Sequence, residues 1–278
     1  FLGGSSGSTS GGVKILRHLI LIKNGILEFK RSLHPNAIIP LRHNHSVVEK
    51  PIVIHVLAFF ILYLILFIIG AGGFAAELTE YIKDNNLMTE KKVEIIGYFD
   101  IDDEQYNRYN FTSPFLGNER KYNFTKSDNI ILAVGNPNLR KNILNYFLNV
   151  ECSFYNFIHY SCKISSSSSI GIGNIFCPNI VVGPNAVIGS HNLFNYNTSV
   201  PHDTHIINNN IFSPYVQLTG FVEVGENNLF GTMVVVVPSI KIGNNNKIQA
   251  ATLVDRNIKD GNLISTNHKK IKIPLYKD

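Results

Sequence analysis

A six-residue period in the second half of the chain constrains the fold more than any other feature. Residue 158 and every sixth position after it, up to residue 254, are apolar without exception. Such a hexad repeat predicts a parallel β-helix, in which each hexad forms one short strand and turn and three hexads complete one coil. Glycine follows the apolar residue at positions 171, 183, 189, 225, 231 and 243.

A second period of eighteen residues lies within the first. Asparagine recurs at this interval from Asn174 to Asn246, and phenylalanine recurs from Phe176 to Phe230. Eighteen residues make one coil, so each set is expected to stack along one corner of the β-helix. Stacked amides can hydrogen-bond along the axis, and asparagine tolerates the left-handed turn conformation. The phenylalanines are predicted to form a stacked core.

The middle of the chain has the pattern of an α/β unit. An apolar strand runs into the glycines of "ILFIIGAGGF" and is followed by a predicted helix from about Phe74 to Asn85. A second predicted strand ends in Asp100 and a third ends in Gly135. Ligands bind at the carboxyl ends of such parallel strands, and a glycine loop lets the backbone approach a pyrophosphate. A solvated acidic turn is an equally good interpretation of Asp100 and Asp102.

The first segment differs from the rest in charge. Residues 1–64 contain seven Lys or Arg and two Asp or Glu, whereas residues 65–278 contain 18 of each kind. The positive charge flanks an apolar run over residues 52–70, which favours a membrane segment over nucleic-acid binding. If Ile65–Ile69 are a buried strand, only the thirteen residues 52–64, all apolar except His55, remain for the bilayer, and a span needs about 20. We expect Ile65–Ile69 to form the strand and not the end of a membrane span.

The cysteine spacing indicates neither a metal site nor a disulfide framework.

Two family resemblances divide the chain. The block "GGSSGSTSGGVKILRHLILIKNGILEFKRSLHPNAIIPLR", followed by "FFILYLILF", resembles a Trk-type potassium transporter. That family surrounds one ion path with four filter loops, and this chain has at most one, residues 3–12, so it is not expected to conduct alone. From about residue 66, "FIIGAGGFAAEL", "AVGNPNLRKNI", "SVPHDTHI" and "FSPYVQLTG" resemble the NeuD/PglD-type sugar acetyltransferases of the hexapeptide-repeat class.

These resemblances imply three domains. Residues 1–64 are expected to be a transmembrane, transporter-like helical fragment, 65–150 a Rossmann-like nucleotide-sugar-binding domain, and 151–278 a left-handed β-helix. The acetyltransferase family further implies a homotrimer with active sites between neighbouring subunits. We expect a fused or wrongly joined reading frame where the two families meet. A cytoplasmic location is expected for residues 65–278, with membrane association only through residues 1–64.

The acetyltransferase resemblance also implies the site residues. His202 is expected to be the general base, with Asp203 raising its basicity or fixing its tautomer, and His205 is the competing base. Backbone amides near Gly220 are expected to hold the acetyl-CoA carbonyl or to stabilise the oxyanion. Ile211 stands where family members often carry a second histidine, so that acetyl-CoA binding there could depend on Ser213 instead. The expected nucleotide-sugar contacts are Gly72, Gly73, Phe74, Asp100, Ile101, Gly135, Asn138 and Arg140. Arg140 is a candidate phosphate partner, and a solvated helix start is an equally good interpretation of "NLRKN".

The predicted function is acetyl transfer from acetyl-CoA to the amine of a UDP-amino-sugar in surface polysaccharide or glycan assembly. O-acetylation of a sialic-acid-like sugar is the alternative within the same fold. Potassium transport, supported by the first segment only, and a catalytically silent β-helix are alternatives of other classes.

Overall fold

The computed structural model describes Lys23, residues 42–43, 46–47 and 63–265. The expected membrane fragment lies almost entirely outside these residues. Two short strands, β1 (Arg42–His43) and β2 (Ser46–Val47), form an antiparallel pair. No helix among the described residues has the length and apolar character needed to cross a membrane. The chain divides into two compact units, and the boundary between them follows Tyr155, slightly beyond the predicted end at residue 150.

The first unit contains a parallel five-stranded sheet. Its strands lie in the order β5-β4-β3-β6-β7, which is the order 3-2-1-4-5 of a doubly wound sheet. The bounds of its elements are β3 (Tyr63–Ile69), α3 (Gly73–Met88), β4 (Lys92–Phe99), η1 (Tyr106–Arg108), β5 (Phe115–Gly117), η2 (Glu119–Lys121), β6 (Asn129–Leu132), α4 (Pro137–Phe147) and β7 (Ser153–Phe154). Residues 136–142, including the first turns of α4, are grouped with the second unit.

The strand predicted over Ile65–Ile69 is confirmed. β3 lies between β4 and β6, and Leu66–Ile69 are buried. Its carboxyl end and that of β6 lie where the strand order reverses, the position at which doubly wound sheets bind ligands. One prediction is wrong in detail, because β6 ends at Leu132 and not at Gly135.

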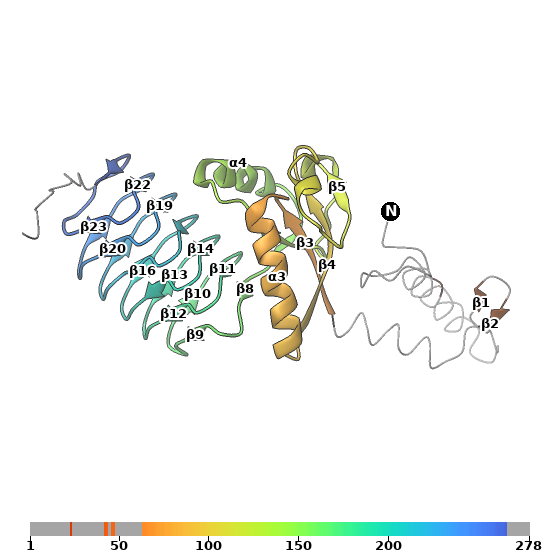
Figure 1. Ribbon diagram of the computed structural model, residues 1–278, viewed down its shortest axis with the longest axis horizontal. Coiled ribbons are helices and arrows are strands. Elements are labelled where there is room, and N and C mark those ends of the chain that lie inside the picture. Colours follow the sequence, from red (N-terminus) through yellow and green to blue (C-terminus); the bar gives the residue numbers. More distant parts are fainter. Residues whose placement is uncertain (1–22, 24–41, 44–45, 48–62, 266–278) are drawn as a thin grey trace, which may run out of the picture. The chain divides into compact units, whose positions relative to one another are not determined.

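The second unit is a parallel β-helix, as the hexad period predicts (Figure 1). Its strands are two residues long: β8 (Phe157–Ile158), β9 (Lys163–Ile164), β10 (Ser169–Ile170), β11 (Ile175–Phe176), β12 (Val181–Val182), β13 (Val187–Ile188), β14 (Leu193–Phe194), β15 (Ser199–Val200), β16 (His205–Ile206), β17 (Ile211–Phe212), β18 (Glu223–Val224), β19 (Leu229–Phe230), β20 (Val235–Val236), β21 (Lys241–Ile242), β22 (Lys247–Ile248), β23 (Leu253–Val254) and β24 (Leu263–Ile264). Strands 18 residues apart pair in parallel, for example Ile188 with Ile206. Bridges through Gln217 connect β15 with β20.

The predicted core register holds from Phe176 to Val254, where every hexad position is buried. The four phenylalanines stack with centroids 4.8, 4.8 and 4.6 Å apart, as predicted. The first hexad is an exception: Ile158 is 37% exposed, and Phe157 is buried in its place. At the start of the β-helix the chain has no earlier coil to align with, so the six-residue register is not yet established.

The asparagine ladder is confirmed, but its conformation is not the predicted one. The side-chain oxygen of Asn192 accepts the backbone N–H of Asn210 at 2.9 Å, and its amide nitrogen donates to the carbonyl of Ile207 at 2.8 Å. The left-handed residues are the ones immediately before the ladder, such as His191 and Asn209. Among the residues that the structure describes, thirteen that are not glycine have positive φ, and they lie at every sixth position from Asn179 to Ala251.

Candidate active site

The expected catalytic pair lies on a turn of the β-helix between β15 and β16. The Nδ1 atom of His202 is 2.9 Å from Oδ2 of Asp203, and the two side chains are 53% and 35% exposed. Asp203 has φ 54°, a left-handed conformation that aspartate tolerates better than most residues. Its N–H donates to the carbonyl of Pro184 in the preceding coil. The structure therefore brings the two side chains together within a hydrogen-bonded turn.

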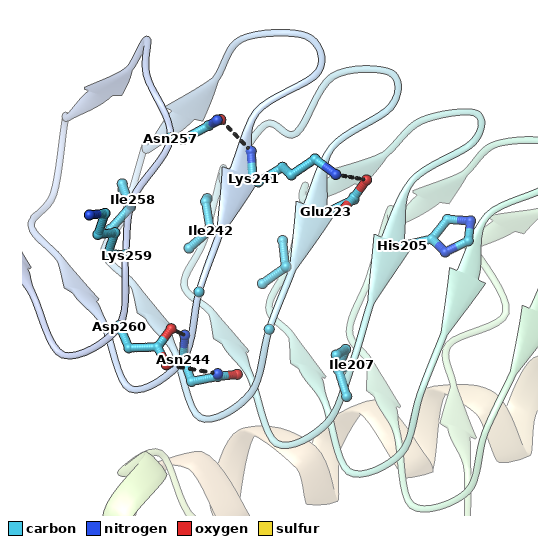
Figure 2. A pocket seen from close by; sticks show the side chains of 13 residues that line it. His205, Ile207, Glu223, Lys241, Ile242, Asn244, Asn257, Ile258, Lys259 and Asp260 are labelled. Carbon is cyan, nitrogen blue, oxygen red and sulfur yellow. Dashed lines mark hydrogen bonds and ion pairs between the residues drawn. The ribbon is translucent and has the colours of Figure 1, made fainter.

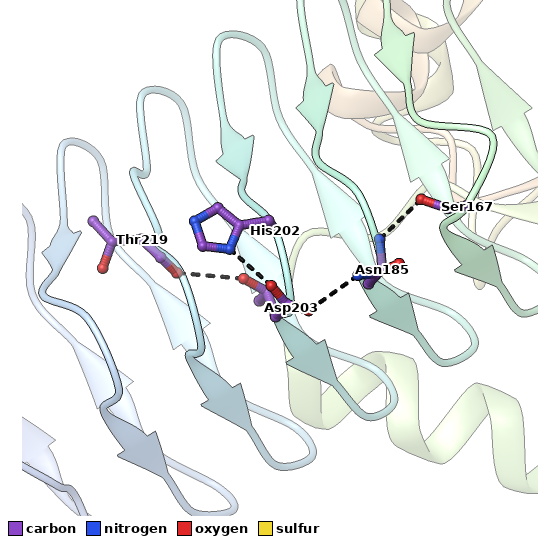
Figure 3. Close-up of polar contacts among 6 residues, drawn as sticks. Ser167, Asn185, His202, Asp203 and Thr219 are labelled. Atoms are coloured by element: carbon purple, nitrogen blue, oxygen red, sulfur yellow. Dashed lines mark hydrogen bonds and ion pairs between the residues drawn. The ribbon is translucent and has the colours of Figure 1, made fainter.

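The turn of the preceding coil extends this pair into a network (Figure 3). The side-chain amide of Asn185 donates to Oδ1 of Asp203 at 3.2 Å, and the N–H of Asn185 donates to Oγ of Ser167 at 3.1 Å. The hydrogen bond with His202, and next the one with Asn185, lower the pKa of the Asp203 carboxyl. Asn185 lies 18 residues before Asp203, so the coil period could have predicted this contact, which the sequence reasoning missed.

The charge state of Asp203 fixes the tautomer of His202. An ionised carboxylate only accepts hydrogen bonds, so we assign the imidazole proton to Nδ1. The lone pair of the neutral ring then lies on Nε2. A histidine in this tautomer can take a proton from a nucleophile at Nε2, which is the requirement for a general base.

Two glycines give the His202 turn its space. A Cβ atom on Gly183 would lie 2.5 Å from the backbone nitrogen of His202, and a Cβ on Gly220 would lie 2.6 Å from Cε1 of its ring. Gly220 thus has a steric reason to be glycine, because the imidazole occupies the space above it. The ring also packs edge-on against Phe221, with centroids 5.2 Å apart and an interplanar angle of 85°.

His205, the competing base, is the first residue of strand β16 and does not lie on the turn that carries His202. In β16 its Cα partners are Val187 and Glu223 on the adjacent strands. It lines an open pocket of about 830 Å³ together with Glu223 and Lys241, whose side chains form an ion pair of 2.8 Å (Figure 2). His202 is the histidine that has a carboxylate partner at hydrogen-bond distance.

The two residues expected near acetyl-CoA differ in accessibility. Ile211 is only 4% exposed, so its side chain offers little surface to a ligand. Ser213 is partly exposed and follows β17 directly. Its N–H donates to the carbonyl of Phe230, and its own carbonyl accepts from Thr198 Oγ1 at 3.4 Å.

The glycine loop of the first unit is held by Asp100. The carboxylate accepts the N–H of Ala71 at 2.9 Å with one oxygen and that of Ile101 at 2.8 Å with the other. Asp100 is therefore engaged in fixing the loop, a role that the sequence reasoning did not give it. Gly70 has φ +103°, and a Cβ there would lie 2.7 Å from the carbonyl oxygen of Ala133.

The end of the loop opens the helix α3. Gly72 is its N-cap and Gly73 its first residue, and no side chain caps these N–H groups. A Cβ on Gly73 would lie 2.9 Å from the hydroxyl of Tyr109, which the sequence reasoning missed. Phe74 is partly buried, whereas Ile101 is 79% exposed. Gly135 and Asn138 are also exposed.

The position of Arg140 does not fit the predicted contact with a phosphate. Its side chain is fully buried, and its guanidinium donates to the carbonyl of His191 at 2.6 Å and to the Asn209 side chain at 3.1 Å. Burial lowers its pKa to about 9. Burial, and next the charge of Arg140, lower the pKa of His191 to about 4. In this position Arg140 anchors the start of α4 to two left-handed turns and is not presented to a phosphate in solvent.

The architecture defines a class of protein: a doubly wound nucleotide-binding-like unit joined to a hexapeptide-repeat β-helix. Residues 65–147 match the family model of the PglD N-terminal domain, and residues 1–78 match the model of the cation transport protein family TrkH. Both resemblances seen in the sequence are thereby confirmed. The two matches overlap at residues 65–78, where the structure has β3 and the beginning of α3.

Solved acetyltransferases share the fold of the two units. A perosamine N-acetyltransferase from Caulobacter crescentus, in complex with CoA and GDP-perosamine, is 24% identical with a TM-score of 0.62, over 71% of this chain and 91% of that one. The acetyltransferase domain of PglB from Neisseria gonorrhoeae is 23% identical with a TM-score of 0.65, over 74% and 98%. The parallel sheets and these neighbours fit a left-handed β-helix.

The curated relatives match the first segment. The Trk system potassium uptake protein TrkH of Escherichia coli K12 is 41% identical over 95 residues, which are 31% of this chain and 20% of that protein. The corresponding protein of Halomonas elongata is 38% identical over 76 residues, 27% and 16% of the two chains. The chain thus spans about a fifth of the length of the curated relatives it matches.

Proposed function

We propose that the chain is an acetyl-CoA-dependent acetyltransferase that acylates the amine of a nucleotide-linked amino sugar, with His202 as the general base. The observation that carries this proposal is the His202–Asp203 hydrogen bond of 2.9 Å on a β-helix turn. The fold it shares with a GDP-perosamine N-acetyltransferase supports the same assignment.

The proposed reaction uses both ring nitrogens of His202, with Nε2 toward the substrate and Nδ1 toward Asp203. The amine nitrogen attacks the thioester carbonyl carbon, and Nε2 of His202 removes a proton from that nitrogen. The tetrahedral intermediate then collapses, the C–S bond breaks, and the proton passes from Nε2 to the departing CoA sulfur. Asp203 stabilises the imidazolium that forms in between, because its carboxylate is already hydrogen-bonded to Nδ1. Amides near Gly220 are proposed to stabilise the oxyanion.

The nucleotide part of the substrate is proposed to bind at the glycine loop of the first unit. Gly72 and Gly73 present uncapped N–H groups at the start of α3, and such a helix N-terminus favours a negatively charged phosphate. Exposed Ile101, Gly135 and Asn138 are proposed to contact the rest of the nucleotide sugar. We do not include Arg140 in this site, because it is buried elsewhere.

Three further features are carried over as proposals from the acetyltransferase resemblance. They are a homotrimer formed through the β-helix, acetyl-CoA bound between neighbouring subunits near Ser213, and a cytoplasmic location for residues 65–278. Cross-linking or sedimentation of the full chain tests the first of them, since a monomer at catalytic concentrations contradicts it.

The activity is tested with the full chain, acetyl-CoA and a panel of UDP- and GDP-linked amino sugars. Mass spectrometry is expected to find an acetylated nucleotide sugar that depends on the native chain. If no member of the panel is acetylated under conditions in which the chain is folded, the proposed function is wrong. The panel includes UDP sugars because the family resemblance implies them and GDP-perosamine because a structural neighbour binds it.

The same product distinguishes N- from O-acetylation. An amide resists hydroxylamine, whereas an acetate ester is cleaved by it. Retention of the acetyl group after hydroxylamine treatment supports the amine as acceptor. Its release supports the alternative, O-acetylation of a sialic-acid-like sugar.

Potassium transport is a second candidate of another class, favoured by the match of residues 1–78 to a cation transport family. The chain carries about a fifth of the length of those relatives, so we propose that it does not transport potassium by itself. Expression in a cell that lacks potassium uptake tests this, and rescue of growth at low potassium would refute the proposal.

A further inference from the structure

Phe221 is an aromatic residue in a backbone conformation that aromatic residues avoid. It has φ 61°, in the left-handed region, and its side chain is 56% exposed. Six of the thirteen left-handed positions of the β-helix are asparagine, the residue that tolerates this conformation best after glycine. Phe221 therefore strains the backbone while burying little apolar surface. Tyr215 and Met233 have the same φ of 61° and are exposed as well, so what sets Phe221 apart is the side chain that its ring contacts.

Phe221 contacts His202 through both its backbone and its ring. It occupies the turn one coil after Asp203, and its N–H donates to the carbonyl of His202 at 3.3 Å. Its ring packs edge-to-face with the His202 imidazole, with centroids 5.2 Å apart. The residue before it, Gly220, leaves the space that the imidazole fills. The turns before and after the His202–Asp203 pair thus each contribute one side chain to it, Asn185 to the carboxylate and Phe221 to the ring.

His202 is half exposed, so it needs the contacts with both Asp203 and Phe221 to keep one orientation. The His202 side chain is 53% exposed, and one hydrogen bond to a partly solvated carboxylate leaves the ring free to rotate whenever that bond opens. An edge-to-face aromatic contact restricts this rotation and keeps water from the part of the imidazole that it covers. With Nδ1 held by Asp203, the contact keeps Nε2 in one direction.

We infer that Phe221 is a positioning residue that holds the His202 imidazole in its catalytic orientation, and that the strained turn is retained for this contact. The inference rests on the proposed function, since it assigns a role to the base of that reaction. Phe221 itself takes no part in proton transfer.

The test compares three variants in the full chain. Phe221→Asn removes the ring and suits the left-handed backbone, so we expect Tm to rise by about 2 to 4 °C while kcat falls by about tenfold, as a misplaced base implies. KM for acetyl-CoA is expected to stay unchanged. Phe221→Tyr keeps the aromatic contact and is expected to keep kcat.

Met233→Asn is the matched control. Met233 has the same φ of 61° and is 61% exposed, but it lies on a different corner of the β-helix. Its substitution is expected to raise Tm by a similar amount and leave kcat unchanged. A purely structural role of Phe221 predicts the same result for both asparagine variants, so native kcat in Phe221→Asn would overturn the inference.

A second measurement keeps this inference separate from the proposed function. The Cε1–H signal of His202, assigned with His202→Gln, is followed by NMR in the full chain. We expect the signal to shift in Phe221→Asn and to stay in place in Met233→Asn. If the native chain acetylates no sugar but the signal shifts, the proposed function fails and the contact stands; if the signal is the same in native and Phe221→Asn chains, the positioning role is wrong.

Discussion

Two columns of residues run along the β-helix at the same interval of eighteen residues. One repeats its side chain from coil to coil, whereas the other repeats only its backbone conformation. The interior column is asparagine at every step from Asn174 to Asn246, and each side chain hydrogen-bonds to the next coil. The corner column keeps the left-handed backbone but changes its side chain from Asn185 through Asp203 and Phe221 to Ser239. Repetition in the interior stabilises the coils. Departure from repetition on the corner coincides with the proposed base and the residues that contact it.

The largest expected effect on activity comes from a substitution of Asp203 in the corner column. Asp203→Asn replaces a pure acceptor by an amide that can donate to Nδ1, which moves the imidazole proton to Nε2 and removes the base. We expect kcat to fall by roughly 10³-fold, as the loss of a general base and its tautomer implies. Circular dichroism should show an unchanged fold, because asparagine suits a left-handed turn. A kcat within a few-fold of native would show that the carboxylate does not control the tautomer.

The interior column is broken by Asn210→Ala. This removes donors to Gly225 and Asn192 and the acceptor of the Asn228 N–H, all within the buried ladder. Leaving such partners unsatisfied is expected to lower the free energy of unfolding by about 3 kcal/mol. Denaturant unfolding measures it, with Asn245→Gly as control, since Asn245 is an exposed left-handed position outside the ladder. Equal destabilisation by both substitutions would contradict the distinction between the columns.

His191, which lies at another left-handed turn of the β-helix, is expected to make stability depend on pH. The pKa of His191 is lowered to about 4 in the folded state, whereas a histidine in the unfolded chain has a pKa near 6.5. At pH values below about 6.5 the unfolded state therefore binds more protons than the folded state. Stability is therefore lost as pH falls from 6.5 toward 4, by about 2 kcal/mol at pH 5. The difference between the native chain and His191→Asn, measured by denaturant unfolding from pH 7.5 to 5, isolates this contribution. A difference that does not change with pH would refute it.

The smallest effect is expected at Gly220, which belongs to the same coil as Phe221. An added Cβ would meet Cε1 of His202 at 2.6 Å and Nε2 at 2.8 Å, so the ring must move. The backbone of Gly220 does not have positive φ, and alanine should not strain it. We expect Gly220→Ala to lower kcat by about tenfold with little change in Tm. A large loss of Tm instead would indicate that the glycine is needed by the fold and not by the ring.

The sequence predicted the β-helix well because its period is carried by buried positions. Phe176 and the hexad residues after it lie in the core as expected, and so does the asparagine ladder. The residue two positions earlier in each hexad is also buried, but the sequence analysis identified this position only where it is an asparagine of the ladder. In the other two hexads of a coil it is apolar in one case, as in Ile180 and Ala186, and polar in the next, as in Thr198 and Thr204, which are buried all the same. Apolarity alone does not reveal a position whose polar groups are satisfied by the next coil.

The site was predictable only in part. His202 and Asp203 are neighbours in the chain, so their contact followed from their sequence. Asn185 and Phe221 come from other coils, and only the coil period connects them to the pair. The burial of Arg140 depends on contacts with Asn209 and His191, some 50 to 70 residues away, which no local pattern in "NLRKN" indicates.

The central claim is that His202 and not His205 is the base of an acetyl transfer. The most direct measurement is the initial rate of nucleotide-sugar acetylation by the native full chain, His202→Ala and His205→Ala, with acetyl-CoA saturating and folding verified. We predict a fall of about 10²- to 10⁴-fold for His202→Ala and a rate within about twofold of native for His205→Ala, since an exposed side chain outside the site has little effect. An unchanged rate in His202→Ala, or a loss confined to His205→Ala, would contradict the account.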